Sequence, residues 1–293
     1  MDCFKRAFIM AKGNMIRWKK DVRIYMIVAI ESVLIIRYFA TATVYGVQNG
    51  LKITPCILPL LFVSDAKSIA KILVYLGAVL LFCNAPFMEE DTPYFIVRSK
   101  RKAWWTGECM YIWMASFVYL VFIMIFPLLV LLPVVSFDQL WGSLLVDFIN
   151  NGNKIDLISL PENLIKIIYP SVAQGLTFLA AWISFVFLGH IIYTINLICN
   201  RNIPGIIVAV FFVVLDAVVN WIGFGSANEW IYWFSPVNWS TMSIWNIPDG
   251  LQIIPMWYAF VMPTVLILIL TIIIGMVSRK KQIDVLSMQQ RKW

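Results

Sequence analysis

Four ionisable side chains stand inside long apolar runs of the sequence, where a lone charge would be costly in hydrocarbon. They are Glu31, Arg37, His190 and Asp216, and Asn220 follows Asp216 by one helical turn. At 1.5 Å of helix rise per residue, Arg37 lies roughly 20 Å and Asp216 roughly 16 Å from the inner ends of their runs. By the same measure Glu31 and His190 both lie roughly 10–12 Å in.

These depths predict two contacts between helices, Arg37 with Asp216 and Glu31 with His190. Polar groups commonly hold helix bundles together, so we favour a structural role for them. Two alternatives remain open: Arg37 facing a wet cavity, and a transport pathway that uses the ionisable groups.

The sequence lacks the residue sets of common catalytic sites. It contains no G-x-x-x-x-G-K-[ST] phosphate loop, and so no site of that kind for ATP hydrolysis. His190 is the only histidine, which excludes a multi-histidine zinc site. The Glu pair at 89–90 has no accompanying histidine set, and the Gly-Phe-Gly-Ser run at 223–226 does not sit on a strand-to-helix turn. We expect no catalytic residue, no metal site and no cofactor in this chain.

The composition is typical of a polytopic α-helical membrane protein. Of the 293 residues 61% are hydrophobic and only 13% are charged, and the mean hydropathy is +0.82. Soluble domains carry about a quarter charged residues. Several apolar runs approach 20 residues, enough to cross about 30 Å of hydrocarbon as helices. We therefore predict a single all-α transmembrane domain, 1–293. The five scattered cysteines predict no disulfide framework.

The apolar runs predict six transmembrane helices. The expected spans are residues 24–45, 68–87, 106–135, 172–197, 204–222 and 256–277. The segments between and after them are a mixed outer loop 46–69, an inner loop 88–105, an outer loop 136–170, a tight inner turn 199–204, an outer segment 223–255 and a tail 278–293. This topology puts 17 Lys and Arg residues inside and five outside, Lys71 among the five, which places both termini in the cytoplasm. The net charge of +7 then reflects topology rather than nucleic-acid binding.

The first 23 residues predict a basic amphipathic helix in the cytoplasmic interface of the membrane. Apolar residues recur there at alternating spacings of four and three, on one helical stripe, and seven cations surround them. The stripe consists of Phe4, Phe8, Ala11, Met15, Trp18 and Val22.

The outer segment 223–255 is aromatic and moderately apolar. Trp and Tyr prefer membrane interfaces, and Ser235-Pro236 divides the segment into two short pieces. We predict a re-entrant helical hairpin packed against the bundle or a partner copy; an aromatic belt on an ordinary loop is the alternative. Its marker residues are Trp230, Trp233, Ser235, Pro236, Trp239 and Trp245.

The inner loop 88–105 carries a helix-start signal and a cluster of cations. Asp91 or Thr92 can cap a helix whose first position is Pro93. The expected short helix then includes Tyr94, Phe95, Val97, Arg98 and Ser99. An ordinary basic loop would explain the cations, but not a capped aromatic helix in so short a connection.

With these features the chain resembles the ABC-2 type permeases, the membrane subunits of type V ABC exporters. The likeness rests on the basic N-terminal helix, the six spans and the Ser235-Pro236 segment before the last span. It also rests on the inner loop PYFIVRSKRKAW, residues 93–104. In that family the inner loop carries a coupling helix that docks on a separate ATPase subunit. The N-terminal arm corresponds to a connecting helix, and the outer hairpin to re-entrant helices near the exit.

The resemblance implies an ATP-driven exporter with two ATPase subunits, which hold ATP and Mg²⁺, and a second permease copy or a paralogue. Asp91 to Ser99 would be the coupling element. The apolar spans favour a hydrophobic or amphipathic cargo such as a peptide, an antibiotic or a lipid, and similar permeases give bacteria protection against antimicrobial peptides. The rival function is an ion-coupled secondary transporter that uses Glu31, Arg37 and Asp216. An intramembrane enzyme is disfavoured by the missing catalytic set.

Overall fold

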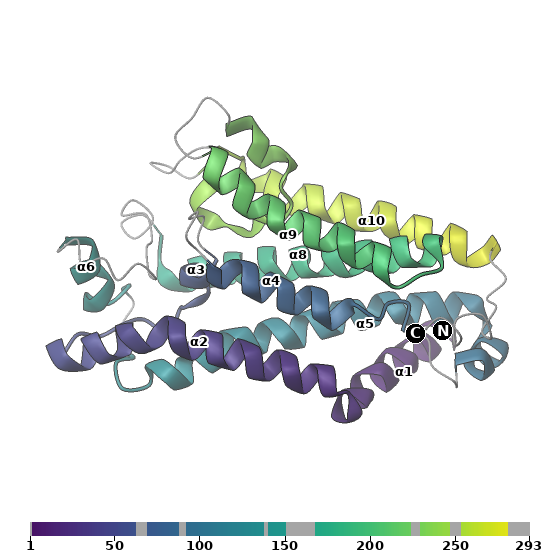
Figure 1. Ribbon diagram of the computed structural model, residues 1–293, viewed down its shortest axis with the longest axis horizontal. Coiled ribbons are helices and arrows are strands. Elements are labelled where there is room, and N and C mark those ends of the chain that lie inside the picture. The colour runs from purple at the N-terminus through teal and green to yellow at the C-terminus, as the bar shows by residue number, and fades with distance from the viewer. Residues whose placement is uncertain are drawn as a thin grey trace.

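The chain forms an elongated bundle of helices (Figure 1). The computed structural model describes residues 2–62, 69–87, 92–137, 140–150, 168–223, 229–246 and 253–280, and the part of α5 from 92 to 100 as backbone only. The helices are α1 (Asp2–Arg17), α2 (Val22–Asn49), α3 (Leu58–Leu61), α4 (Ile69–Phe82), α5 (Thr92–Leu131), α6 (Ser143–Asn150), α8 (Pro170–Cys199), α9 (Ile203–Gly223) and α10 (Met256–Lys280). The described residues include no strand, in agreement with the predicted all-α class.

Five helices are long and apolar enough to cross a membrane: α2, the part of α5 from Arg101 to Leu131, α8, α9 and α10. They coincide with five of the six predicted spans. The remaining prediction, 68–87, corresponds to α4, which has 14 residues and a length of about 21 Å. That length is short of the roughly 30 Å of a hydrocarbon core.

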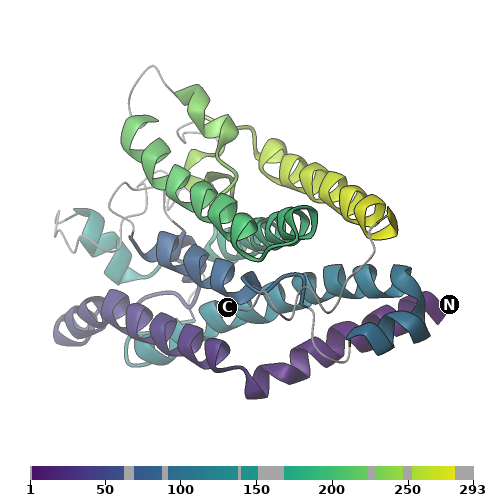
Figure 2. The same ribbon diagram turned by 45° about the vertical axis from the view of Figure 1, so that its right-hand side comes forward.

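One end of the bundle collects exposed cations, and we call it the basic end. There lie α1, the start of α5, the turn between α8 and α9 with Arg201, and the end of α10 with Arg279 (Figure 1). In Figure 2 the first turns of α5 lie at an angle to the rest of that helix, beside α1. Residues 88–105 were expected to form a loop with a short helix; from Thr92 onward they are instead the beginning of the 40-residue α5. Asp91 lies outside the described residues.

Helix α1 packs closely on α5. Its buried face consists of Ala7, Met10, Ala11 and Asn14, while Phe4 and Phe8 of the predicted stripe are exposed. Gly107 of α5 allows the approach, because a Cβ there would lie 2.9 Å from the backbone oxygen of Ala7. The indole of Trp18 donates a hydrogen bond of 2.9 Å to the hydroxyl of Tyr111. One face of α1 is therefore buried against α5.

Asp21 caps the start of α2. Its carboxylate accepts a hydrogen bond of 3.0 Å from the backbone N–H of Arg23, and it forms an ion pair with the Arg23 guanidinium. Partial burial alone would raise the pKa of Asp21, but the side-chain and backbone hydrogen bonds from Arg23 outweigh it and lower that pKa. The Asp21 carboxylate therefore stays ionised at neutral pH, and its negative charge interacts favourably with the positive end of the α2 dipole.

At the other end of the bundle, segments expected as outer loops pack into the core. Leu58, Leu60 and Leu61 of the α3 region are fully buried, and the Leu58 N–H donates to the side-chain oxygen of Gln174 in α8 at 2.9 Å. Helix α6 is tied to α2 by a hydrogen bond of 2.8 Å from the Tyr45 hydroxyl to an Asp147 carboxylate oxygen.

Asn196 joins three segments at the basic end. Its amide donates to the backbone oxygen of Ala85 at 2.7 Å, and its oxygen accepts from the Gly205 N–H in the first turn of α9 at 2.8 Å. Asn196→Ala would leave both buried backbone groups without a partner. We expect a loss of about 1–3 kcal/mol in the free energy of unfolding, measured by denaturant titration in detergent.

The matched control for Asn196→Ala is Asn49→Ala at the exposed end of α2, which we expect to change the stability by less than about 0.5 kcal/mol. Equal losses in the two variants would show that the Asn196 bridge contributes nothing special.

Candidate functional site: an ion pair beneath the cap segment

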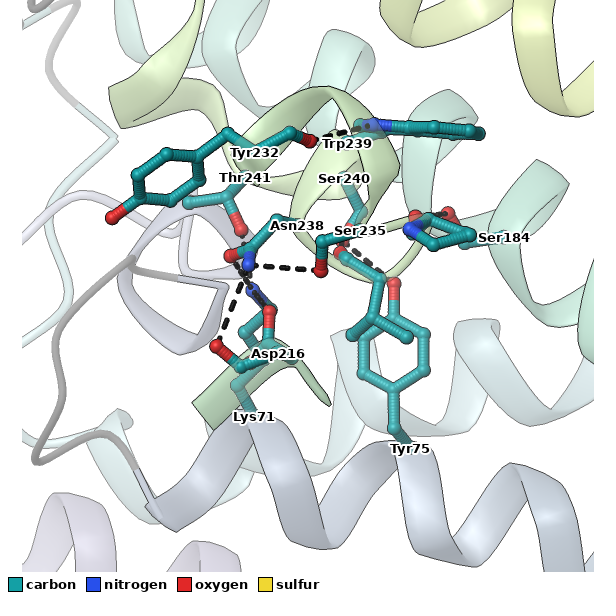
Figure 3. A network of polar contacts seen from close by, with 12 residues as sticks. Lys71, Tyr75, Ser184, Asp216, Tyr232, Ser235, Asn238, Trp239, Ser240 and Thr241 are labelled. Carbon is teal, nitrogen blue, oxygen red and sulfur yellow. Dashed lines mark hydrogen bonds and ion pairs between the residues drawn. The ribbon is translucent and has the colours of Figure 1, made fainter. Parts of the chain in front are cut away.

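Residues 229–246, here called the cap segment, fold over the ends of α4 and α9 away from the basic end. They form three short 3₁₀ helices, Glu229–Phe234, Asn238–Ser240 and Met242–Ile244, where two helical pieces were expected. Polar side chains of this segment are buried rather than solvated, and they include Ser235, Asn238, Ser240 and Thr241. Figure 3 shows them pointing down towards α4 and α9. The segment thus brings hydrogen-bonding groups into an apolar bundle.

Beneath the cap segment lies a buried ion pair between Lys71 of α4 and Asp216 of α9 (Figure 3). The Lys71 ammonium is 2.6 Å from a carboxylate oxygen of Asp216, and the two side chains are 1% and 2% exposed. The ammonium also donates to the side-chain oxygens of Thr241 at 2.6 Å and Asn238 at 3.2 Å. An ammonium has three N–H groups, so every donor of Lys71 is used within the protein.

Asn238 is the link between the ion pair and the cap segment. Its side-chain NH₂ donates to the Asp216 backbone oxygen at 3.4 Å and to the Ser235 hydroxyl at 3.1 Å, while its oxygen accepts from Lys71. Both N–H groups and the oxygen of this amide are therefore satisfied. A buried charge pair with all its donors satisfied avoids the penalty that an unpaired ion would carry.

A second contact pins the cap segment one helical turn along α4. The Tyr75 hydroxyl donates to the Ser240 hydroxyl at 2.6 Å, and Ser240 donates in turn to the Val237 backbone oxygen at 2.8 Å. Lys71 and Tyr75 are four residues apart, so they share one helix face (Figure 3). From α8, the Ser184 hydroxyl reaches the Pro236 backbone oxygen at 3.5 Å.

The structure corrects both predicted ion contacts. Asp216 pairs with Lys71 and not with Arg37, which is exposed on α2. His190 is buried, but its Nδ1 lies 2.8 Å from the Val186 backbone oxygen within the same helix and does not contact Glu31. Depth along a helix does not say which face of that helix a side chain occupies. Asn220 is buried one turn beyond Asp216, as the shared face predicted.

Glu31 is held by a tyrosine instead. The Tyr119 hydroxyl lies 3.1 Å from Glu31 Oε1 and 2.8 Å from the Val74 backbone oxygen, so it links α2, α4 and α5. Gly77 of α4 makes this possible, because a Cβ there would collide with the Tyr119 hydroxyl and with Glu31 Oε1. The contact is a packed junction of three helices.

The tryptophans of the cap segment differ in how far they are buried. Trp230 is 61% exposed, as an aromatic belt would predict. Trp239 and Trp245 are buried, and their indoles donate to the backbone oxygens of Tyr232 and Trp239 at 3.1 and 3.0 Å. Trp233 is partly buried and stacks edge-on against Tyr258 of α10. Most of these aromatic residues therefore build the cap segment rather than an interfacial belt.

Lys71 was the residue that sequence reasoning missed as a site residue, because it was counted among the outer cations. A signal was present: Lys71 and Asp216 both lie within roughly 10 Å of the outer ends of their predicted spans. The four-residue spacing of Lys71 and Tyr75 was a second signal.

The described residues contain no cluster of His, Cys, Asp or Glu that could hold a metal ion. The polar network can therefore anchor the cap segment and join α4 to α9, but it supplies no nucleophile set or metal centre among those residues. No family model, curated protein or solved structure matches this chain.

Proposed function

We propose that this chain is the permease subunit of an ATP-driven exporter for a hydrophobic or amphipathic cargo. The observation that carries the proposal is the extension of α5 beyond its apolar part. The helix begins at Thr92, and four cations stand at positions 98–102, ahead of its long apolar run. The eleven residues from 92 to 102 span about 16 Å at the basic end. An arm helix packed on the neighbouring turns of α5 would carry motion from a partner at this end into the bundle.

In this proposal α4 is the second of six spans, and the cap segment, which is hydrogen-bonded to Lys71 and Tyr75, covers its outer end. The basic end faces the cytoplasm of a bacterial cell, since cations concentrate on that side of membrane proteins. The complex would contain two ATPase subunits and a second permease. Thr92 to Ser99 would contact the ATPase, and the exposed Phe4 and Phe8 of α1 would lie in the membrane interface.

The rival function, an ion-coupled carrier, has less support. It would need Glu31, Arg37 and Asp216 to cooperate. In the described structure Asp216 forms an ion pair with Lys71, and Glu31 is hydrogen-bonded to Tyr119. All three N–H groups of the Lys71 ammonium donate to acceptors within the protein, so none is left to bind a transported anion.

The test is a photocrosslinking residue placed at Tyr94 or Phe95, in the full chain in its native membrane. We expect a crosslink to a soluble-domain protein that is also labelled by an azido-ATP probe. The variant Tyr94→Ala/Phe95→Ala/Arg98→Glu, which carries no crosslinker, should lose the co-purification of the labelled protein, because it removes aromatic contacts and reverses a charge.

The control is the same crosslinker at Tyr169, which is exposed and precedes α8 at the opposite end of the bundle. A nucleotide-binding partner captured equally from Tyr169, or retained by the triple variant, would contradict the proposed docking site. The absence of any azido-ATP-labelled partner would contradict ATP-driven export.

A further inference from the structure

Arg37 lies near the middle of α2 and is exposed. It is 15 residues from Val22 and 12 from Asn49, so it stands roughly 22 Å and 18 Å from the two helix ends. No hydrogen bond or ion pair of Arg37 occurs among the residues that the structure describes. A guanidinium cannot shed its charge, so a single chain would present a full cation at the level of the hydrocarbon core.

The surroundings of Arg37 on α2 are apolar. Val33 and Val44 share its face and are 66% and 56% exposed, and the adjacent Ile36 is 47% exposed. Such a face suits lipid or another helix and would be a poor wall for a water-filled cavity. Long cations near helix ends can reach the interface, but Arg37 is too central to do so.

The spans that the structure describes offer no exposed counter-ion at this depth. The acidic residues of the described spans are Glu31, Glu108 and Asp216, and all three are buried. A second copy docked on α2 would therefore bring apolar side chains, or in a symmetric α2–α2 contact a second Arg37. Charge complementarity therefore favours a different chain that carries a carboxylate over an identical copy.

We propose that the face of α2 around Val33, Arg37, Thr41 and Val44 binds a transmembrane helix of a different protein, which places an Asp or Glu carboxylate against Arg37. Arginine and carboxylate form two parallel hydrogen bonds, and a dry interface strengthens them. The partner is thus a non-identical membrane subunit. The inference rests on α2 crossing the membrane and not on ATP-driven export, so it can fail while a nucleotide-binding partner is still found, and the reverse.

The experiment places a photocrosslinking residue at Val33 or Thr41 in the full chain, with Arg37 unchanged, in the native membrane. We expect one crosslinked membrane protein that differs from this chain and whose crosslinked peptide is an apolar run containing Asp or Glu. Arg37→Glu should lower the yield at least about tenfold, since a buried pair is replaced by like charges. Changing the partner's acid to Arg in that background should restore it.

The matched control position is Leu268, an exposed apolar residue of α10 that has no charge beside it. We expect no change in its crosslinks when Arg37 is replaced by Glu.

Three results would overturn the proposal. One is a crosslink from Val33 to a second copy of this chain with a yield that Arg37→Glu leaves unchanged. Another is a crosslink to lipid alone. The third is fast labelling of Arg37→Cys by a charged, water-soluble thiosulfonate, read at that site by mass spectrometry, because it would show a wet cavity. The second uses the native Arg37 alone, so it does not depend on a variant that folds.

Discussion

Lys71→Met is expected to destabilise the folded protein by about 3–5 kcal/mol, the usual loss when one partner of a buried ion pair is removed. The methionine would fill nearly the same space, but the Asp216 carboxylate would remain 2% exposed with no cation beside it. Thr241 and Asn238 would lose a donor as well. The measurement is unfolding of the purified protein by SDS titration in mixed micelles, followed by tryptophan fluorescence.

The double variant Lys71→Met/Asp216→Leu separates charge from packing. Replacing both ions by apolar side chains is often neutral or stabilising, so the double variant should recover most of the loss. Lys20→Met, at an exposed lysine, is the control and should leave stability unchanged within about 0.5 kcal/mol. A double variant as unstable as the single one would mean that the pair does more than compensate its own charges.

Gly77→Ala is expected to be the second most damaging single change. Alanine is a better helix former than glycine by up to about 1 kcal/mol. Here, however, its Cβ would occupy the place of the Tyr119 hydroxyl and of Glu31 Oε1. Moving two buried side chains costs about 1–3 kcal/mol, and the hydrogen bonds of Tyr119 would be lost in addition. We therefore expect a net loss of stability in the same SDS titration.

Two further variants test the cause of this loss. Gly175→Ala in α8 makes the same chemical change where no atom lies within 4 Å, and it should be neutral or slightly stabilising. Gly77→Ala combined with Glu31→Ala and Tyr119→Phe removes the colliding oxygens and should be more stable than Gly77→Ala alone. If Gly77→Ala and Gly175→Ala behaved alike, close packing at Gly77 would not be the reason for the glycine.

The positions of the long helices could be predicted from sequence because long apolar runs end at clear breaks. Pro170 and the turn around Asn200 bound α8, and the predicted span 172–197 differs from it by two residues at each end. The start of α5 was less visible, because charged residues at 98–102 read as a loop while their helical propensity is high. The helix continues through them without a break.

The side-chain partners could not be predicted in the same way. The predicted depths of Arg37 and Asp216 are similar, but depth does not fix the side of a helix on which a residue lies. Arg37 lies on the exposed side of α2. The cap segment shows the same limit, since its composition is equally compatible with interfacial and buried tryptophans. Trp230 is exposed and Trp239 is buried, and Trp239 packs edge-on against Tyr258 of α10, a tertiary contact that the local sequence does not show.

The ion pair beneath the cap segment also bears on when each helix becomes fixed in the bundle during synthesis. Lys71 and Asp216 are 145 residues apart, and Thr241 is 170 residues from Lys71. At 5–20 residues per second, a ribosome needs roughly 7–30 s to deliver the carboxylate after the lysine. During that interval α4 is a 14-residue helix with an uncompensated cation in its first turn. The ion pair that holds α4 in the bundle therefore forms only after α9 has been made. Although α4 is synthesised early, it is among the last helices to gain its final contacts.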